Sequence, residues 1–253
     1  MRCRIHILPS TSESRAEGYT IFQRFLKETV KYDPKPPGQR KDARTKIFFQ
    51  AARFHLGFPS GGQTPTSMKL NHGLHLAYCT NIHRGENWQQ TFDALQQYTL
   101  AVKERVCPNG PYAIGLRLGD TASRELSDPR TLLDFQRWLD RNQCYIFTIN
   151  GFPFGRFHGG PVKEQVYWPD WTTPERLAYT NRLFDLLAQL VPADVEGSVS
   201  TVPGSFKDFI KSDDQLQAIR TNVWRCVEHI ARVSDQTGRK LHLGLEPEPL
   251  CLL

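Results

Sequence analysis

The sequence of 253 residues predicts an α/β fold of consecutive βα units, arranged as part of an eight-stranded barrel. From Leu74 onward, short apolar runs alternate with longer segments whose apolar residues recur every three or four positions. This alternation is typical of a parallel sheet covered by helices. A polar loop containing glycine or proline follows each apolar run, and in βα repeats such loops gather at one rim of the sheet, where ligands bind.

Five strands are expected from the apolar runs, at Leu74–Cys79, Tyr112–Leu116, Tyr145–Asn150, Gly197–Val202 and Leu241–Glu246. The segments between them carry apolar stripes at helical spacing. One stripe comprises Leu216, Ile219, Val223, Val227 and Ile230, and another comprises Leu183, Phe184, Leu187 and Leu190. The pair Asp128-Pro129 suits a helix start, because aspartate caps free N–H groups and proline has none to satisfy.

The strand count predicts an incomplete barrel. Eight βα units usually take about 250 residues, but residues 68–253 yield five strands, and the last lies close to Leu253. An open parallel sheet would leave its last edge uncovered. We therefore expect residues 68–253 to be the N-terminal part of a (β/α)8 TIM barrel, truncated at its C-terminus. A five-stranded doubly wound fold is the alternative, and it would bind its ligand where the strand order reverses.

Residues 1–67 form a basic N-terminal extension. They contain 12 lysines and arginines against 5 acidic residues, whereas residues 68–253 contain 20 against 21. Two basic amphipathic helices fit residues 19–30 and 43–56, and stretches rich in proline and glycine follow each of them, so the extension is expected to be helical or poorly structured. No basic stripe follows residue 68, so nucleic-acid binding is not expected, and binding through the extension ranks last.

Several protein classes are excluded by what the sequence lacks. No apolar run approaches the roughly 20 residues that cross a bilayer, and no secretion signal begins the chain, so a soluble cytoplasmic protein without membrane insertion is expected. The six cysteines have no CxxC spacing, which argues against a disulfide framework or a zinc site. The GxSxG, P-loop, GxGxxG and HExxH motifs are absent.

The loops after the first and third strands carry most of the candidate site residues. Tyr78, Asn81 and His83 follow the first strand, where they can face a ligand. Asn81 and His83 can equally satisfy loop backbone groups. The long loop after the third strand combines aromatic and polar residues, the composition that a small polyol needs, and its candidates are Asn150, Phe154, His158 and Lys163. Its phenylalanines can instead plug the barrel mouth.

The fourth and fifth strands add hydroxyl groups and a carboxylate. Ser200 and Thr201 can bind ligand hydroxyl groups, although such side chains often pair with nearby backbone. Glu246 ends the fifth strand, and a buried carboxylate requires a metal ion or an ion pair. Arg117 is the candidate ion-pair partner. One carboxylate alone binds a divalent ion poorly, so further ligands would have to come from elsewhere.

Five stretches of the chain resemble a known family: LAYCTNIHRGENW, GLRLG, FTINGFPFGRFHGGPVKEQVYWPDW, SVSTVPGSFK and GLEPEP. Together they are similar to the xylose-isomerase-like TIM barrels of the metabolite traffic protein EboE type. The resemblance runs from about His75 to Pro249 and does not extend into residues 1–67. It implies a sugar-isomerase-like barrel linked to the export of secondary-metabolite precursors, with other proteins of the same export cluster as partners.

The resemblance also implies a divalent metal, Mg²⁺, Mn²⁺ or Zn²⁺, bound by Glu246 and by residues from strands beyond Leu253. This chain is therefore not expected to complete the site. It further implies that His83, His158 and Lys163 transfer protons or bind substrate, in a metal-assisted isomerase or epimerase acting on a small polyhydroxylated metabolite or secondary-metabolite precursor. The alternative function is a non-catalytic protein that binds the metabolite and hands it on.

Overall fold

The computed structural model describes residues 68–70, 74–155 and 164–252. Its strands, in chain order, are β1 (Tyr78–Cys79), β2 (Tyr112–Arg117), β3 (Cys144–Asn150), β4 (Gly197–Thr201), β5 (Ser205–Phe206), β6 (Leu241–Leu245) and β7 (Cys251–Leu252). The α-helices are α3 (Trp88–Ala94), α4 (Leu100–Val106), α5 (Asp120–Leu126), α6 (Pro129–Arg141), α7 (Pro174–Leu190) and α8 (Asp213–Thr237). The shorter helical segments are η2 (Thr80–Ile82), η3 (Leu95–Thr99), η4 (Glu164–Tyr167) and η5 (Lys207–Phe209).

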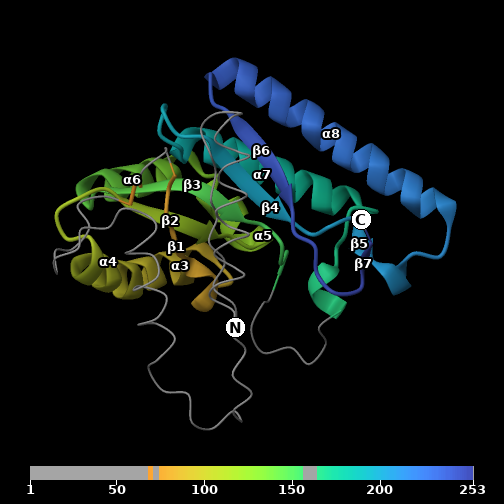
Figure 1. Cartoon of the computed structure of the whole chain (residues 1–253), viewed down its shortest axis with the longest axis horizontal. Coiled ribbons are helices and arrows are strands. Elements are labelled where there is room, and N and C mark those ends of the chain that lie inside the picture. Colours follow the sequence, from red (N-terminus) through yellow and green to blue (C-terminus); the bar gives the residue numbers. More distant parts are fainter. Residues whose placement is uncertain (1–67, 71–73, 156–163, 253) are drawn as a thin grey trace, which may run out of the picture.

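Five strands form one parallel sheet in the order β1-β2-β3-β4-β6 (Figure 1). The α/β class and the five predicted strands are thus confirmed. The order follows the chain, so the described sheet contains no reversal of the kind that the doubly wound alternative requires. Since all five strands run the same way, their carboxyl ends meet at one edge of the sheet, which we call the carboxyl rim.

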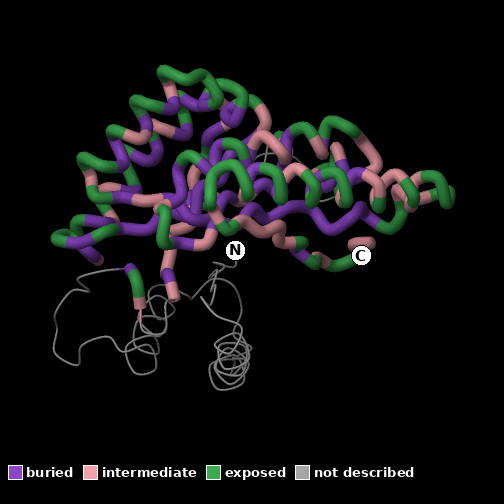
Figure 2. The backbone as a smooth tube through the Cα atoms, turned by 90° about the horizontal axis from the view of Figure 1, so that it is seen from above, coloured by how far each residue is buried: buried purple, intermediate pink, exposed green. Residues whose placement is uncertain are grey.

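Helices cover one face of the sheet, which we call the helix face. A Cβ atom added at Gly197 would lie 2.8 Å from Leu241 of β6 and 3.1 Å from Leu187 of α7. The neighbouring residue on this face, Val199, is fully buried. Strands β2, β3 and β4 are buried along most of their length, and Figure 2 shows helices that turn exposed residues outward. Strands of this kind sit in the core because helices exclude water from them.

The opposite face, which we call the polar face, carries small and polar side chains. Because side chains alternate along a strand, Ser198 and Ser200 point away from the helix face that Val199 occupies. The Oγ atom of Ser198 donates a hydrogen bond to Thr148 Oγ1 at 2.9 Å, across the β3–β4 pair. The next strand contributes Gly244 opposite Ser200. The central strands are therefore apolar toward the helices and polar on the other side.

Helix ends follow the expected chemistry. The Oδ1 atom of Asp128 accepts a hydrogen bond from the Thr131 N–H at 2.9 Å, and Pro129 begins α6, as predicted. Helix α8 ends at Gly238, whose φ of 68° is the left-handed conformation that glycine adopts readily. The predicted apolar stripe of α8 is wrong at Val227, which is 42% exposed. Cys226, fully buried, takes its place in the stripe.

The start of the domain also differs from the prediction. Strand β1 is limited to Tyr78–Cys79, because the residues before it fold back on Met68 instead of pairing with β2. His75 forms an antiparallel bridge with Lys69, and the Leu76 N–H donates to the Met68 carbonyl at 2.9 Å. The helices predicted at 19–30 and 43–56 lie outside the described residues. No helix in the described part of the chain is long and apolar enough to cross a membrane.

Candidate functional site

Four strand ends bring candidate residues to the carboxyl rim. The register places Arg117 beside Asn150, Asn150 beside Ser200, and Ser200 beside Gly244. Glu246 follows immediately, and its N–H donates to the Thr201 carbonyl at 3.0 Å. Asn150, Ser200 and Glu246 therefore lie at the ends of neighbouring parallel strands. Within the described residues, the candidate site is the part of the polar face at this rim.

The polar face is filled at one side of the sheet and open at the other. A Cβ atom added at Gly115 would lie 3.2 Å from Cys79 Sγ and 3.4 Å from Thr148. Among the described residues, a Cβ atom added at Gly244 would meet nothing nearer than 3.8 Å, the distance to the Ser200 Cα atom. The described residues therefore pack more loosely at Gly244 than at Gly115. They leave room for a small group beside Ser200 and Gly244.

The two predicted hydroxyl residues of β4 lie on opposite faces. Ser200 is on the polar face and only 4% exposed, and among the described contacts its Oγ atom has no hydrogen-bond partner. Thr201, on the helix face by alternation, is fully buried, and its Oγ1 atom likewise lacks a described partner. Buried polar atoms are nearly always paired in proteins. Ser200 is the one that faces the site.

Asn150 ends β3 on the polar face beside Ser200. Its Oδ1 atom accepts a hydrogen bond from the Phe152 N–H at 3.1 Å, which turns the chain away from the strand. The carboxamide NH2 group remains as a donor for a ligand. Asn150 thus combines a structural role in the turn with a position at the site.

An aromatic cluster stands above this part of the rim. Phe152 contacts Tyr167 at 5.4 Å between ring centroids, and Tyr167 contacts Phe206 at the same distance. Tyr167 is 4% exposed, its hydroxyl group has no described hydrogen-bond partner, and burial raises its pKa. Tyr167 was not predicted from the sequence. Its place in a segment dense in aromatic residues, VYWPDW, was the available signal.

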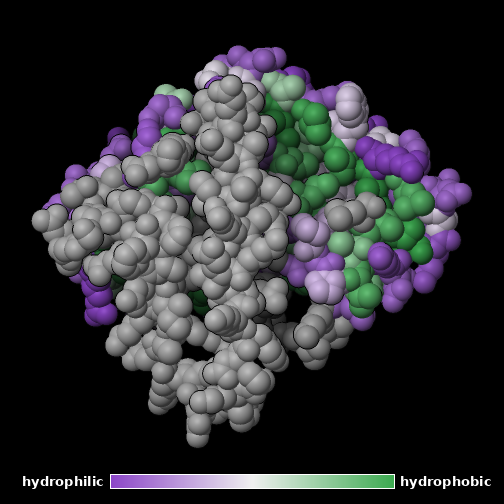
Figure 3. All heavy atoms as spheres, in the orientation of Figure 1, coloured by the Kyte–Doolittle hydropathy of each residue, from purple (hydrophilic) through white to green (hydrophobic). Residues whose placement is uncertain are grey.

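The segment after β6 packs beside β5, the strand that carries Phe206 of the aromatic cluster. Strand β7 pairs antiparallel with β5, and the Lys207 N–H donates to the Leu250 carbonyl at 2.9 Å. Phe206 of β5 contacts Phe209 at 5.2 Å. Apolar residues gather on this side of the molecule (Figure 3). Trp168, Leu245 and Leu250 have exposed side chains.

Phe154 lies on the helix side of the loop. Its ring contacts Tyr179 of α7 at 5.0 Å, and the Arg176 guanidinium lies 5.8 Å from its centroid. Phe154 therefore packs against α7, and Phe152 is the phenylalanine that joins the aromatic cluster. His158 and Lys163, also predicted in this loop, lie outside the described residues.

Tyr78 and His83 form a separate cluster on the helix side of β1. The Tyr78 hydroxyl group and His83 Nε2 are 2.8 Å apart, and His83 stacks on Tyr98 with 4.6 Å between centroids. Tyr78 also contacts Tyr112 of β2. Burial lowers the pKa of His83. Asn81 lies next to this cluster in η2. The structure therefore does not bring these three residues together with Ser200 and Tyr167.

Glu246 is 9% exposed and follows Gly244 on the polar face. Arg117, considered as its ion-pair partner, ends β2, which is separated from β6 by β3 and β4, and its guanidinium donates to the carbonyls of Gly85 and Gly155. Among the described residues, no group of three or more His, Cys, Asp or Glu side chains could hold a metal ion. One carboxylate is too few ligands for a divalent cation, so the described residues alone do not fit the implied metal.

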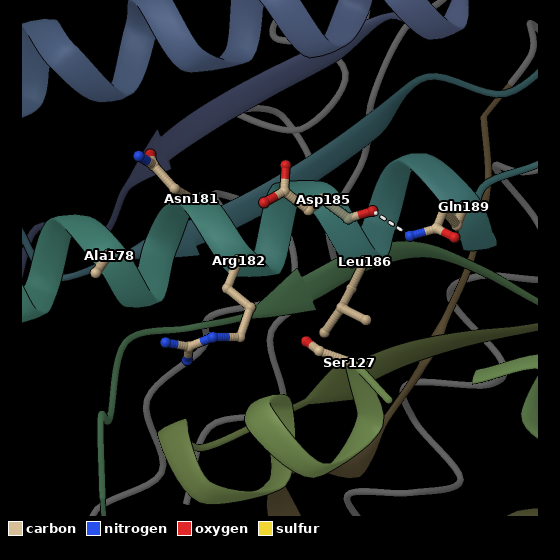
Figure 4. A pocket seen from close by; sticks show the side chains of 7 residues that line it. All are labelled: Ser127, Ala178, Asn181, Arg182, Asp185, Leu186 and Gln189. Atoms are coloured by element: carbon tan, nitrogen blue, oxygen red, sulfur yellow. Dashed lines mark hydrogen bonds between the residues drawn. The ribbon is translucent and has the colours of Figure 1, made fainter. Parts of the chain in front are cut away.

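A groove of about 450 Å³ lies elsewhere, on the outer side of α7 (Figure 4). Its lining includes Arg182, bonded to Asp120 at 2.8 Å, and Asp185, bonded to His229 at 2.7 Å. These two contacts engage the charged side chains of the groove. None of the residues predicted from the sequence lines it.

No family model matches the chain, and no curated protein matches it at a significant level.

Proposed function

We propose that this chain binds a small polyhydroxylated metabolite at the carboxyl rim of the polar face. The observation that carries the proposal is the pair of buried hydroxyl groups, on Ser200 and Tyr167, that lack hydrogen-bond partners among the described contacts. A buried hydroxyl group costs about 1–3 kcal/mol when unpaired. A ligand rich in hydroxyl groups supplies both the donors and the acceptors that would satisfy them.

The surroundings suit the same class of ligand. Gly244 leaves room beside Ser200, and the Asn150 carboxamide adds a donor at the adjacent strand end. The rings of Phe152, Tyr167 and Phe206 supply an apolar wall. Aromatic walls with a few placed polar groups are typical of small-molecule sites, and they match the apolar C–H surfaces of a sugar or a cyclic polyol.

The sheet is proposed to be part of a (β/α)8 TIM barrel of the xylose-isomerase-like type. Strands that follow each other in chain order, all parallel and with helices on one face, are the arrangement of such a barrel. In the described sheet β6 pairs only with β4, and Leu245 at its end is 43% exposed. An uncovered edge with exposed apolar side chains is where further βα units would add. The resemblance to the EboE type supports the same architecture.

A binding or hand-off role is what the described residues support best. The second candidate is a metal-assisted isomerase, and it is favoured by the position of Glu246, buried at the rim and on the polar face. Glu246 would be one ligand of the ion, which would polarise substrate oxygens when bound. The resemblance extends this proposal to partners among the other proteins of an export cluster.

The test is a titration of the full chain with D-xylose and myo-inositol, followed by amide chemical shifts. We expect shifts at the ends of β3, β4 and β6, and weaker binding in the Ser200→Ala variant. The matched control is Ser127→Ala, in the groove beside α7, which should bind as the wild type does. Binding lost in Ser127→Ala but kept in Ser200→Ala would contradict the proposed site.

The same titration with and without Mn²⁺ separates the two roles. Affinity that is unchanged by Mn²⁺ and by Glu246→Gln supports binding and hand-off. Affinity that requires Mn²⁺ and is lost in Glu246→Gln supports the metal-assisted enzyme instead. Absence of shifts with every polyol tested would refute the proposed function.

A further inference from the structure

Two buried arginines hold the loop that leaves β3. We propose that Arg117 and Arg176 are positioning residues, which fix the loop Gly151–Gly155 as a preformed wall of the ligand site. This inference rests on the proposed function, because it concerns the same site. It assigns a role to two residues that the sequence analysis did not place in the binding machinery.

Arg176 holds the beginning of the loop. Its side chain is fully buried near the start of α7, and its Nη1 atom donates to the Gly151 carbonyl at 2.8 Å. Its Nε atom donates to the Pro169 carbonyl, also at 2.8 Å. The guanidinium lies beside the contacting rings of Phe154 and Tyr179, 5.8 Å and 5.4 Å from their centroids. A planar group with donors on two sides is needed for these contacts, and arginine alone supplies it.

Arg117 holds the end of the same loop. It is 4% exposed at the end of β2, and its Nη2 atom donates to the Gly155 carbonyl at 2.8 Å. Its Nη1 atom donates to the Gly85 carbonyl at 2.8 Å, which ties in the loop after β1. The Asp120 N–H adds a bond to the Phe154 carbonyl at 2.8 Å. Three of the five loop residues, Gly151, Phe154 and Gly155, therefore have a carbonyl that accepts a hydrogen bond. The donors are Arg176, Asp120 and Arg117, respectively.

Burying two guanidinium groups costs free energy. This cost indicates that the hydrogen bonds made by the two groups are important for the structure. Desolvation of a charge is offset only when its donors are well paired. Burial lowers the pKa of Arg176 to about 10, so the group stays charged at neutral pH. The acceptors bonded here are mainly backbone carbonyls. Arginines that bond backbone carbonyls fix the course of the chain.

The course of this loop decides the geometry of the candidate site. The Gly151 N–H donates to the Ser200 carbonyl at 2.8 Å, so the loop begins against the strand that carries the site serine. Phe152 follows, bonded to Asn150 and in contact with Tyr167. A shift of the loop would move Phe152 and Asn150 relative to Ser200. If the loop is already fixed before binding, no conformational entropy is lost in ordering it when the ligand binds.

The experiment compares Arg176→Lys with Arg182→Lys, using D-xylose as the probe. Lysine at position 176 keeps the charge but cannot bond Pro169 and Gly151 in the same planar geometry. Arg182 lies on the same helix and bonds Asp120 on its outer side, so its variant is the matched control. We expect D-xylose affinity to fall about tenfold in Arg176→Lys, the effect of losing one positioning bond, and to stay unchanged in Arg182→Lys.

Amide hydrogen exchange supplies the readout that general destabilisation would not give. In Arg176→Lys we expect faster exchange confined to residues 151–155, with the amides of α8 unchanged. In Arg176→Ala, millimolar guanidinium should restore D-xylose binding by occupying the vacated position. Unchanged exchange and unchanged affinity in Arg176→Lys would overturn the inference, and so would exchange that rises equally throughout the domain.

The outcomes also separate this inference from the proposed function. If the wild-type chain binds no polyol, the proposed function fails, and the exchange pattern alone decides whether the arginines position the loop. If the wild-type chain binds D-xylose and Arg176→Lys binds it equally well, the proposed function stands and the arginine role fails.

Discussion

Alanine at Gly197 and alanine at Gly244 are predicted to have opposite consequences. The two glycines lie on neighbouring strands, but Gly197 faces the helices and Gly244 faces the polar side. A methyl group at Gly197 would lie 2.8 Å from a Leu241 methyl carbon and 3.1 Å and 3.3 Å from Leu187. Leu187 is fully buried, so its side chain cannot move aside into solvent. A methyl group at Gly244 would meet only ordinary contacts, at 3.8–3.9 Å.

The expected magnitudes follow from packing. Forcing an extra methyl group into a filled core costs about 1–3 kcal/mol, so Gly197→Ala should lower the free energy of unfolding by that amount. At Gly244 the loss of chain entropy in the unfolded state should make alanine neutral or stabilising by up to about 1 kcal/mol. Gly244→Ala should still weaken polyol binding, because it takes space beside Ser200.

Urea denaturation followed by far-UV circular dichroism measures both variants. A difference of 1 kcal/mol corresponds to about 2–4 °C in melting temperature for a domain of this size, so thermal melts provide an independent check. Equal destabilisation by the two substitutions would refute the assignment of a filled face and an open face. So would a more stable Gly197→Ala variant.

Three further predictions concern stability and pH. Trp171→Phe removes the bond from Nε1 to the Val202 carbonyl, 2.9 Å long and fully buried, and should cost about 1–3 kcal/mol in urea denaturation, whereas a loss below about 0.5 kcal/mol would contradict this. Asn87→Ala removes the cap that accepts the Gln90 N–H at 2.9 Å, and should cost about 1 kcal/mol by the same assay, while an unchanged midpoint would show that the cap is unimportant. Burial lowers the pKa of His75 from 6.5, so the unfolded state binds its proton more readily. Stability should therefore fall as the pH drops through 6.5 toward the lowered pKa, by at most about 1.4 kcal/mol per pH unit. His75→Gln should flatten this slope, and an unaltered slope would contradict the assignment.

Much of the sheet could be predicted because its signals are local. Short apolar runs bounded by glycine and proline located all five strands of the main sheet, and the Asp128-Pro129 pair located the start of α6. The first strand was overestimated, because its apolar run cannot reveal that His75 pairs with Lys69. The predicted apolar stripe of α8 was wrong at Val227. The adjacent position, Cys226, is almost equally suited to face the core.

The candidate site was less predictable, because it depends on which face each side chain occupies. Ser200 and Asn150 were placed correctly at the carboxyl rim, since parallel strands must end together. Tyr78 was expected at the same place, but the register with β2 turns it toward the helices. Phe154 was predicted as a site residue, but Phe152 is the phenylalanine that belongs to the aromatic cluster. Two phenylalanines separated by one residue cannot be distinguished without knowing the course of the loop.

Tyr167, Arg117 and Arg176 show a second limit. Tyr167 reaches the site from η4, which precedes α7, and its importance appears only once its hydroxyl group is seen to be buried. The two arginines bond backbone carbonyls, and a sequence does not reveal which carbonyl lies within reach. Contacts that depend on tertiary geometry leave little trace in the residue pattern.

The position of a bound polyol would show whether the proposed site exists. In crystals of the chain soaked with D-xylose, we predict ligand density within hydrogen-bond distance of Ser200 Oγ and the Tyr167 hydroxyl group, against the ring of Phe152. Density in the groove beside α7, or on the helix side of β1 near His83, would contradict this prediction.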